Sequence, residues 1–197
     1  MNRLTRQVLL TGLLTIAIAR LQAQVHTFEI RMGSRVVGAI EARCNVNGAA
    51  RNMEIKSRIE TTLLSKFTDI SCEFTNNILV ASRVVRSSTG KAEDSKEITT
   101  RRNGSRYLIN LEGEKSTLDN VEIQHSVSDL YFTEPLQVTR IYSETLGKLL
   151  SIRSLGNGAY ELSLPEGKKN IYRYQKGALV EVEVSHMLGK AHIVKIG

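Results

Sequence analysis

The chain has 197 residues, 41% hydrophobic and 24% charged, with a formal net charge of +7. This length is enough for one domain that buries about two thirds of its unfolded surface. The charge excess is too small for a nucleic-acid footprint, so we expect no nucleic-acid partner, although it favours contact with anionic envelope surfaces. Phosphate-binding glycine loops, EF-hand loops and dinucleotide fingerprints are absent from the sequence, and no cofactor is expected.

The N-terminus has the features of a secretory signal peptide. Arg3 and Arg6 precede the uncharged run VLLTGLLTIAIA, residues 8–19, and Ala23 is a small residue suited to cleavage. An apolar run of about twelve residues is shorter than the roughly 20 that a transmembrane helix needs. We therefore predict a signal peptide over residues 1–23, a mature chain without a transmembrane segment, and a periplasmic or secreted location.

The remainder, residues 24–197, is predicted to be one β-rich domain because apolar and polar residues alternate along it. In VVGAIEARCNV, residues 36–46, every second residue is apolar or small, and NMEIKSRIE, residues 52–60, repeats the pattern. Turn signals such as the NG pairs at Asn47 and Asn103 separate the runs. The expected fold is all-β: an antiparallel meander of about ten strands, curled into an open barrel or half-barrel, with one short helical turn. A two-sheet sandwich is the alternative.

Alternation also predicts a register for the C-terminal strands. The register places Glu183 opposite Lys195 and His186 opposite His192, with a three-residue loop at 188–190. Two histidines are too few for a catalytic zinc site, so no metal is expected. The residues expected to face inward are Tyr160, Leu162, Leu164, Tyr172, Tyr174, Val180, Val182, Val184, Val194 and Ile196.

The two cysteines, Cys44 and Cys72, lie in mid-strand on apolar faces. An oxidising compartment would invite a disulfide between them. The predicted register, however, puts Cys44 opposite Ile55 and Cys72 opposite Ser57, more than about 10 Å apart, whereas a disulfide needs about 4.4–6.8 Å between Cα atoms. We therefore predict two free, buried thiols.

The stretch HSVSDLYFTEP, residues 125–135, interrupts the alternation. Ser126 or Ser128 can cap a single helical turn that ends before Pro135. Adjacent large apolar residues then cover one end of the sheet, either as a plug for the core or as the lip of a binding trough. In the second case the binding residues are Tyr131, Phe132, Glu134, Tyr142, Tyr172 and Tyr174.

Catalysis is the weaker interpretation. No serine lies in a G-x-S-x-G elbow, and the cysteines are mid-strand. His125, Asp129 and Glu134 could converge on one side of the helical turn, but a satisfied polar cluster at the sheet edge explains them equally well. No catalytic residue is assigned.

The strings SVSDLYFTEP, IYSETLGKLLSI and AYELSLPEGKKNIYRYQKGALVEVEV, with the hairpin GSRVVG (Gly33–Gly38), resemble a family of secreted bacterial β-rich proteins known only as a domain of unknown function. They are also loosely similar to uncharacterised periplasmic families with open-barrel folds. The resemblance implies a fold and a compartment, but no reaction, substrate or catalytic residue.

Three classes of function follow. The first is a non-catalytic protein that binds an apolar or extended ligand of the cell envelope. The second is a structural or assembly component without a small ligand, and the third, least favoured, is an enzyme. An apolar cavity of about 300 Å³ or more favours the ligand, a filled interior favours the structural role, and polar groups converging on His125 or His186 favour the enzyme. No protein partner can be named.

Overall fold

The computed structural model describes residues 22–61, 65–89, 95–186 and 189–196, and strands account for most of them. The strands are β1 (Gln22–Met32), β2 (Arg35–Asn47), β3 (Ala50–Glu60), β4 (Ser65–Thr75), β5 (Ile78–Ser88), β6 (Lys96–Asn103), β7 (Arg106–Leu111), β8 (Glu114–Asp119), β9 (Arg140–Ser143), β10 (Lys148–Gly156), β11 (Ala159–Ser163), β12 (Lys169–Gln175), β13 (Ala178–His186) and β14 (Gly189–Ile196). Two short 3-10 helices, η1 (Val127–Tyr131) and η2 (Pro165–Gly167), interrupt them. The predicted all-β fold is confirmed.

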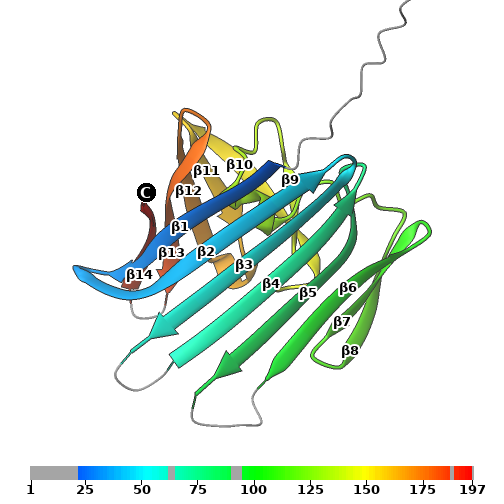
Figure 1. The fold of residues 1–197 in the computed structure, drawn as a ribbon, viewed down its shortest axis with the longest axis horizontal. Coiled ribbons are helices and arrows are strands. Elements are labelled where there is room, and N and C mark those ends of the chain that lie inside the picture. The colour runs from blue at the N-terminus through cyan, green and yellow to red at the C-terminus, as the bar shows by residue number, and fades with distance from the viewer. Residues whose placement is uncertain (1–21, 62–64, 90–94, 187–188, 197) are drawn as a thin grey trace, which may run out of the picture.

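The strands form one antiparallel sheet in the order β8-β7-β6-β5-β4-β3-β2-β1-β14-β13-β12-β11-β10-β9. Strands that follow each other in the chain are neighbours in the sheet, except β8 and β9, which are its two edges. β1 pairs with β14, so the two ends of the described chain meet in the middle of the sheet. Figure 1 shows β1–β8 as a broad front layer with β9–β13 behind it. The sheet therefore curls without closing, as predicted for an open barrel.

The described residues form fourteen strands rather than the predicted ten or so. Several of the strands are short: β8 has 6 residues, β9 has 4 and β11 has 5. A strand of this length has only two or three inward positions, which is too few for alternation to stand out from the neighbouring turns.

The predicted inward face is correct along β12 and wrong in parts of β13 and β14. A bulge between Arg173 and Tyr174 shifts the pairing of β12 with β13, and Leu179 rather than Val180 is buried. Glu183 pairs with His192 instead of Lys195. This shift by an odd number of residues reverses the faces of β14, so Ile193, not Val194, packs on the core.

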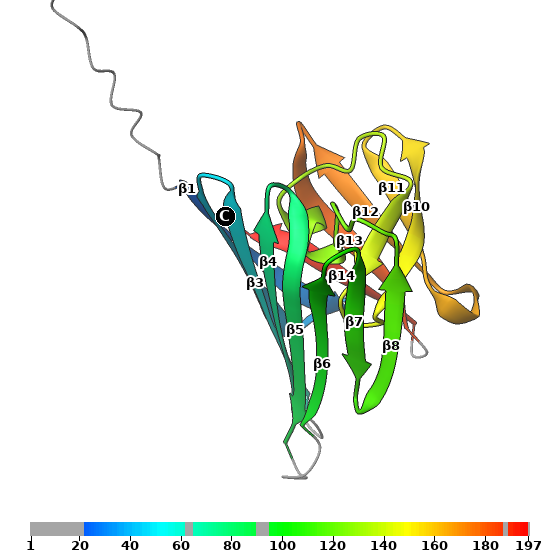
Figure 2. The same ribbon diagram turned by 90° about the vertical axis from the view of Figure 1, so that its right-hand side faces the viewer.

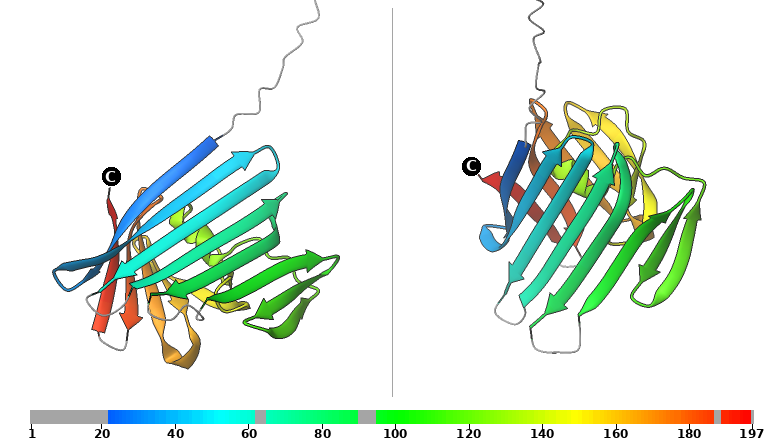
Figure 3. Two further views of the ribbon diagram at one scale, coloured as in Figure 1. Left: turned by 60° about the horizontal axis from the view of Figure 1, so that its bottom comes forward. Right: turned by 45° about the vertical axis from the view of Figure 1, so that its right-hand side comes forward.

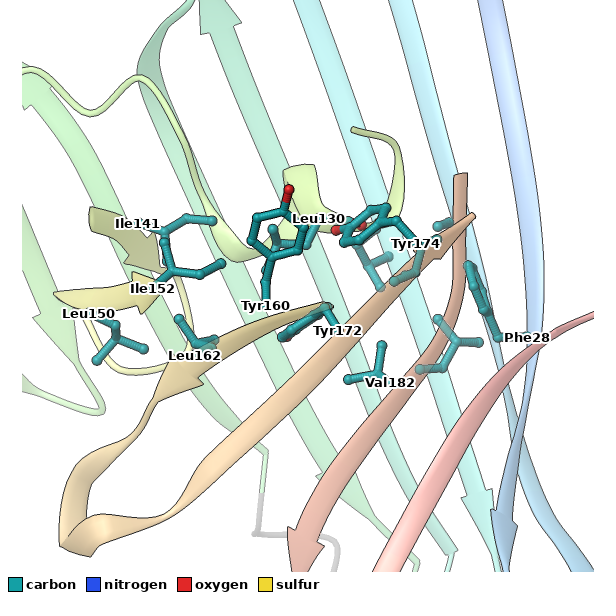
Figure 4. Packing of buried hydrophobic residues seen from close by; sticks show 14 of the residues in the cluster. Phe28, Leu130, Ile141, Leu150, Ile152, Tyr160, Leu162, Tyr172, Tyr174 and Val182 are labelled. Atoms are coloured by element: carbon teal, nitrogen blue, oxygen red, sulfur yellow. The ribbon is translucent and has the colours of Figure 1, made fainter. Parts of the chain in front are cut away.

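Two clusters of apolar side chains fill much of the inner face of the sheet. The first, drawn in Figure 4, is centred on β10–β13 and β1. The second lies between β2–β7 and the β9–β10 hairpin and includes Met53, Phe74 and Tyr107. The hydroxyl groups of Tyr142 on β9 and Thr100 on β6 are 2.6 Å apart and share a buried hydrogen bond. Side-chain contacts thus hold β9 near β6 although the two strands do not pair.

β1 begins two residues before the predicted cleavage point, because Gln22 pairs with Val46 and Ala23 with Asn45. Cleavage after Ala23 would shorten β1 by these two residues and leave the rest of its pairing intact. Residues 1–21 lie outside the described residues, so the signal peptide stays a prediction. Within the described ranges, no helix has the length and apolar character needed to span a membrane.

Candidate functional site

Residues 125–135 fold into a plug inside the curled sheet. Its short helix η1, the yellow-green coil in Figures 2 and 3, lies between the two layers. Ser126 begins the turn: its backbone N–H donates to Asp129 Oδ2 at 2.7 Å, and its hydroxyl group donates to the same oxygen at 3.2 Å. The predicted turn with a serine cap is therefore present.

Leu130 anchors the plug in the core and is only 1% exposed. The hydroxyl group of Tyr174 donates to the Leu130 carbonyl at 2.7 Å, and Figure 4 shows Leu130 beside the Tyr174 ring. Tyr131 packs edge-on against Phe28, with ring centroids 5.4 Å apart. Tyr131 and Phe132 are partly buried against the core. The plug therefore covers the sheet as expected, although its most deeply buried apolar side chain is that of Leu130.

A pocket of about 480 Å³, the plug pocket, opens beside this segment. His125, Asp129 and Glu134 all line it, but no described hydrogen bond joins one to another. Asp129 forms an ion pair with Arg51 as well as capping η1, and Glu134 accepts a hydrogen bond from Tyr160 at 2.8 Å. The two carboxylates thus hold the plug in place. This favours the interpretation of His125, Asp129 and Glu134 as a satisfied polar cluster over a catalytic role. The remaining lining residues are Asn77, Gln124, Leu130, Thr133, Pro135, Leu136, Val138 and Ile141.

Three of the six residues predicted to bind a ligand are core residues. Tyr142, Tyr172 and Tyr174 are 0%, 3% and 5% exposed and line neither the plug pocket nor the apolar pocket described below. Burial raises the pKa of Tyr142 to about 12. Of the six, Glu134 lines the plug pocket. Alternation predicted which side of each strand faces inward, but it carries no information about which part of that side is covered.

The predicted pairing of His186 with His192 is wrong. His186 pairs with Gly189. Of the predicted loop 188–190, Gly189 and Lys190 belong to β14 instead, and residue 188 lies outside the described residues. His192 pairs with Glu183, and its Nδ1 lies 2.6 Å from Glu181 Oε1 on the same neighbouring strand. The described part of the chain contains no group of three or more histidine, cysteine or acidic residues suited to a metal ion.

A buried polar cluster that no sequence pattern predicted lies under the plug. The Glu144 carboxylate is 1% exposed and accepts hydrogen bonds from the backbone N–H of Ser128, at 3.1 Å, and from the Cys72 thiol, at 3.3 Å. Burial, together with the nearby Glu144 charge, raises the pKa of Cys72 well above its ordinary value. The cluster joins β4, the plug and the β9–β10 turn, and its contacts are internal to the fold.

A second pocket lies at the other end of the sheet. The apolar pocket, about 390 Å³ in volume, is lined by Ile30, Met32, Val37, Ile40, Ser57, Ile59, Thr61, Lys66, Val184, Ala191 and Ile193. These residues come from β1–β4 and β13–β14 and the residue that follows β3. Arg51 of the plug pocket and Ile59 of the apolar pocket lie eight residues apart on β3, which is about 27 Å at the rise of a strand.

The apolar pocket exists because the plug covers only one half of the inner face. On β3, Met53 and Ile55 are 1% and 3% exposed, whereas Ile59, further along the same face, is only partly buried. On β14, Ile193 is likewise only partly buried. Apolar side chains on this half therefore face each other across space that no described side chain fills.

A curled, open antiparallel sheet with an internal plug defines a β-barrel-like protein. The chain belongs to the family described as "Domain of unknown function (DUF6134)", whose model matches residues 28–196. This confirms the predicted relation to an uncharacterised β-rich family.

Among solved structures, the chain is similar to the crystal structure of a beta-barrel-like protein of domain of unknown function DUF1849 from Brucella abortus. The sequences are 8% identical, the match covers 90% of this chain and 97% of that one, and the TM-score is 0.53. At this identity the likeness concerns the fold alone. No curated protein matches the chain significantly.

Proposed function

We propose that this protein is a non-catalytic binding protein that holds an apolar or extended ligand in the apolar pocket. The volume of about 390 Å³ carries the proposal, because it exceeds the roughly 300 Å³ at which ligand pockets begin. Most of the lining residues are aliphatic, as in pockets whose ligands bind through loss of contact with water.

The binding region therefore differs from the one predicted from the sequence. The tyrosines of the predicted trough are buried under the plug, whereas the pocket residues are aliphatic side chains on the uncovered half of the same inner face. With a signal peptide over residues 1–23, the ligand would be a component of the cell envelope, met in the periplasm or outside the cell.

A structural or assembly role without a small ligand is the second candidate. The hydrogen bonds and the deep burial around the plug favour a structural role, because a well-packed, hydrogen-bonded interior makes the protein rigid. A structural protein has no need of an open apolar pocket, however, so ligand binding is preferred.

The proposal is tested by filling the apolar pocket with a larger side chain. Ala191 lines it, so Ala191→Phe places a large ring in the open space. Binding of the neutral apolar dye Nile red to the wild type, followed by fluorescence, is expected to weaken at least about tenfold, equivalent to about 1.4 kcal/mol, with the fold unchanged by circular dichroism.

Ala39→Phe is the matched control, because Ala39 is exposed on the outer side of β2. It should leave dye binding at the level of the wild type. A wild-type protein that binds no dye, or an Ala191→Phe protein that binds it equally well, contradicts the proposal.

A further inference from the structure

We propose that the apolar pocket selects a single-chain amphiphile with an anionic head, and that Lys66 binds the head. This inference rests on the proposed function and names the class of ligand. It starts from the position of Lys66, which lines the pocket and is directly opposite Ile59 across β3 and β4.

The direction of Lys66 follows from strand alternation. Phe74 and Cys72 are buried on the inner side of β4, and residues two apart share a side. Thr68 and Lys66 continue that row toward the apolar pocket, so the inner side of β4 changes from apolar to polar along its length. The ammonium group of Lys66 therefore lies where the aliphatic wall of the apolar pocket meets solvent.

Among the described residues that line the apolar pocket, Lys66 is the single charged side chain and none is a carboxylate. Other lysines near this end have partners: Lys190 lies 2.6 Å from Glu183, and Lys96 lies 2.7 Å from Glu112. The structure assigns no ion pair with a described residue to Lys66. A lysine without a carboxylate beside an apolar wall is suited to an anion whose tail lies on that wall.

Arg86 adds to the positive potential. It pairs with Thr68 on β4, which places it diagonal to Lys66 on the same inner side. Its guanidinium group donates to the Thr145 carbonyl at 3.3 Å, and no described carboxylate forms an ion pair with it. Two cations on neighbouring strands thus face one end of the interior.

The size of the pocket favours one acyl chain. A volume of about 390 Å³ is near the lower end of the range for ligand pockets. Of the described lining residues, Ser57, Thr61 and Lys66 have polar side chains, and Lys66 alone carries a charge that can hold an anionic head. A carboxylate head and a phosphate head are both negatively charged and both accept hydrogen bonds, so the ammonium group of Lys66 can bind either.

The experiment compares ligands that differ only in the head: tetradecanoate, tetradecyl phosphate and tetradecanol, each displacing Nile red at neutral pH. Lys66→Met keeps the length of the side chain and removes its charge. We expect the variant to bind one or both anions about fivefold more weakly than the wild type, as for an exposed ion pair, and to bind tetradecanol equally well. The anion with the larger loss identifies the head.

Two further variants make the result specific. Lys66→Arg should restore anion binding, because it restores the charge. Lys56→Met removes an exposed lysine from the outer side of β3 and should change nothing.

An equal loss for tetradecanol and for both anions, or no loss for either anion, overturns the assignment of Lys66 while leaving the apolar pocket in place. If the wild type binds neither dye nor any of the three ligands, the proposed function itself fails, and this outcome differs from the other two.

Discussion

Cys44 and Cys72 lie opposite the same residue, Met53, on the two sides of β3. All three side chains are buried on the inner face. Two strand spacings separate the cysteines, about 10 Å, which is beyond the reach of a disulfide. The predicted free state of both thiols is confirmed, but the predicted neighbours, Ile55 and Ser57, are wrong.

The thiols should be unreactive in the folded protein and free after unfolding. Burial raises the pKa of both Cys44 and Cys72, and the reactive thiolate is therefore scarce. Iodoacetamide is expected to label native Cys72 more than about tenfold more slowly than a free cysteine. Mass spectrometry after unfolding without reductant should find two labels per chain. Finding none would contradict the strand order around Met53.

The fold is expected to be lost in alkali through its buried tyrosines. Burial raises the pKa of Tyr131, Tyr172 and Tyr174 above the ordinary 10.0, and that of Tyr142 to about 12. Because the folded state favours the neutral phenol, this contribution to stability is complete below the unfolded pKa of about 10 and is lost as pH rises through the folded values.

Tyrosinate absorbance should therefore appear together with the loss of near-ultraviolet circular dichroism as the pH is raised above about 10. Gradual titration of all the tyrosines near their ordinary pKa, with the circular dichroism spectrum unchanged, would be inconsistent with this burial.

Leu130→Ala should destabilise the protein by about 2–5 kcal/mol, because the side chain is 1% exposed and its removal leaves a cavity in the core. Urea unfolding followed by circular dichroism measures the change. Leu136→Ala is the matched control, since Leu136 is 67% exposed, and it should change the free energy of unfolding by less than about 0.5 kcal/mol. Similar costs for the two substitutions would show that the plug does not anchor the interior.

Gly38→Ala should destabilise the protein by about 3 kcal/mol or more. An added Cβ would lie 2.2 Å from the Arg58 carbonyl oxygen, and a backbone atom of a paired strand cannot easily move away. At Gly48, where φ is +57° and nothing lies within 4 Å of an added Cβ, the same substitution should cost about 1–2 kcal/mol from backbone strain alone. Thermal unfolding compares the two variants, and an equal cost would argue against the close approach of β2 and β3.

The sequence by itself determined the local features. Alternation set the all-β class and the inward side of β2, β3, β11 and β12, because the side-chain period of a strand is two wherever one face is buried. A serine cap, Ser126 or Ser128, and Pro135 predicted the short turn, because a cap and a helix terminator act within a few residues, and the structure selects Ser126. The free state of the two cysteines could be predicted despite a wrong register. The predicted register and the observed one both leave β3 between the cysteines, which keeps them two strand spacings apart.

Tertiary structure alone decided the register and the site. The connection between β3 and β4 and the bulge at Arg173 shift the pairing by amounts that alternation cannot reveal. The pairing of β1 with β14 brings Ile193 to the wall that also holds Ile59 and Lys66. Whether an inward side chain is covered depends on where the plug ends, and that boundary is set by the packing of Leu130 against distant strands. The apolar pocket is therefore a property of long-range packing, which no local pattern encodes.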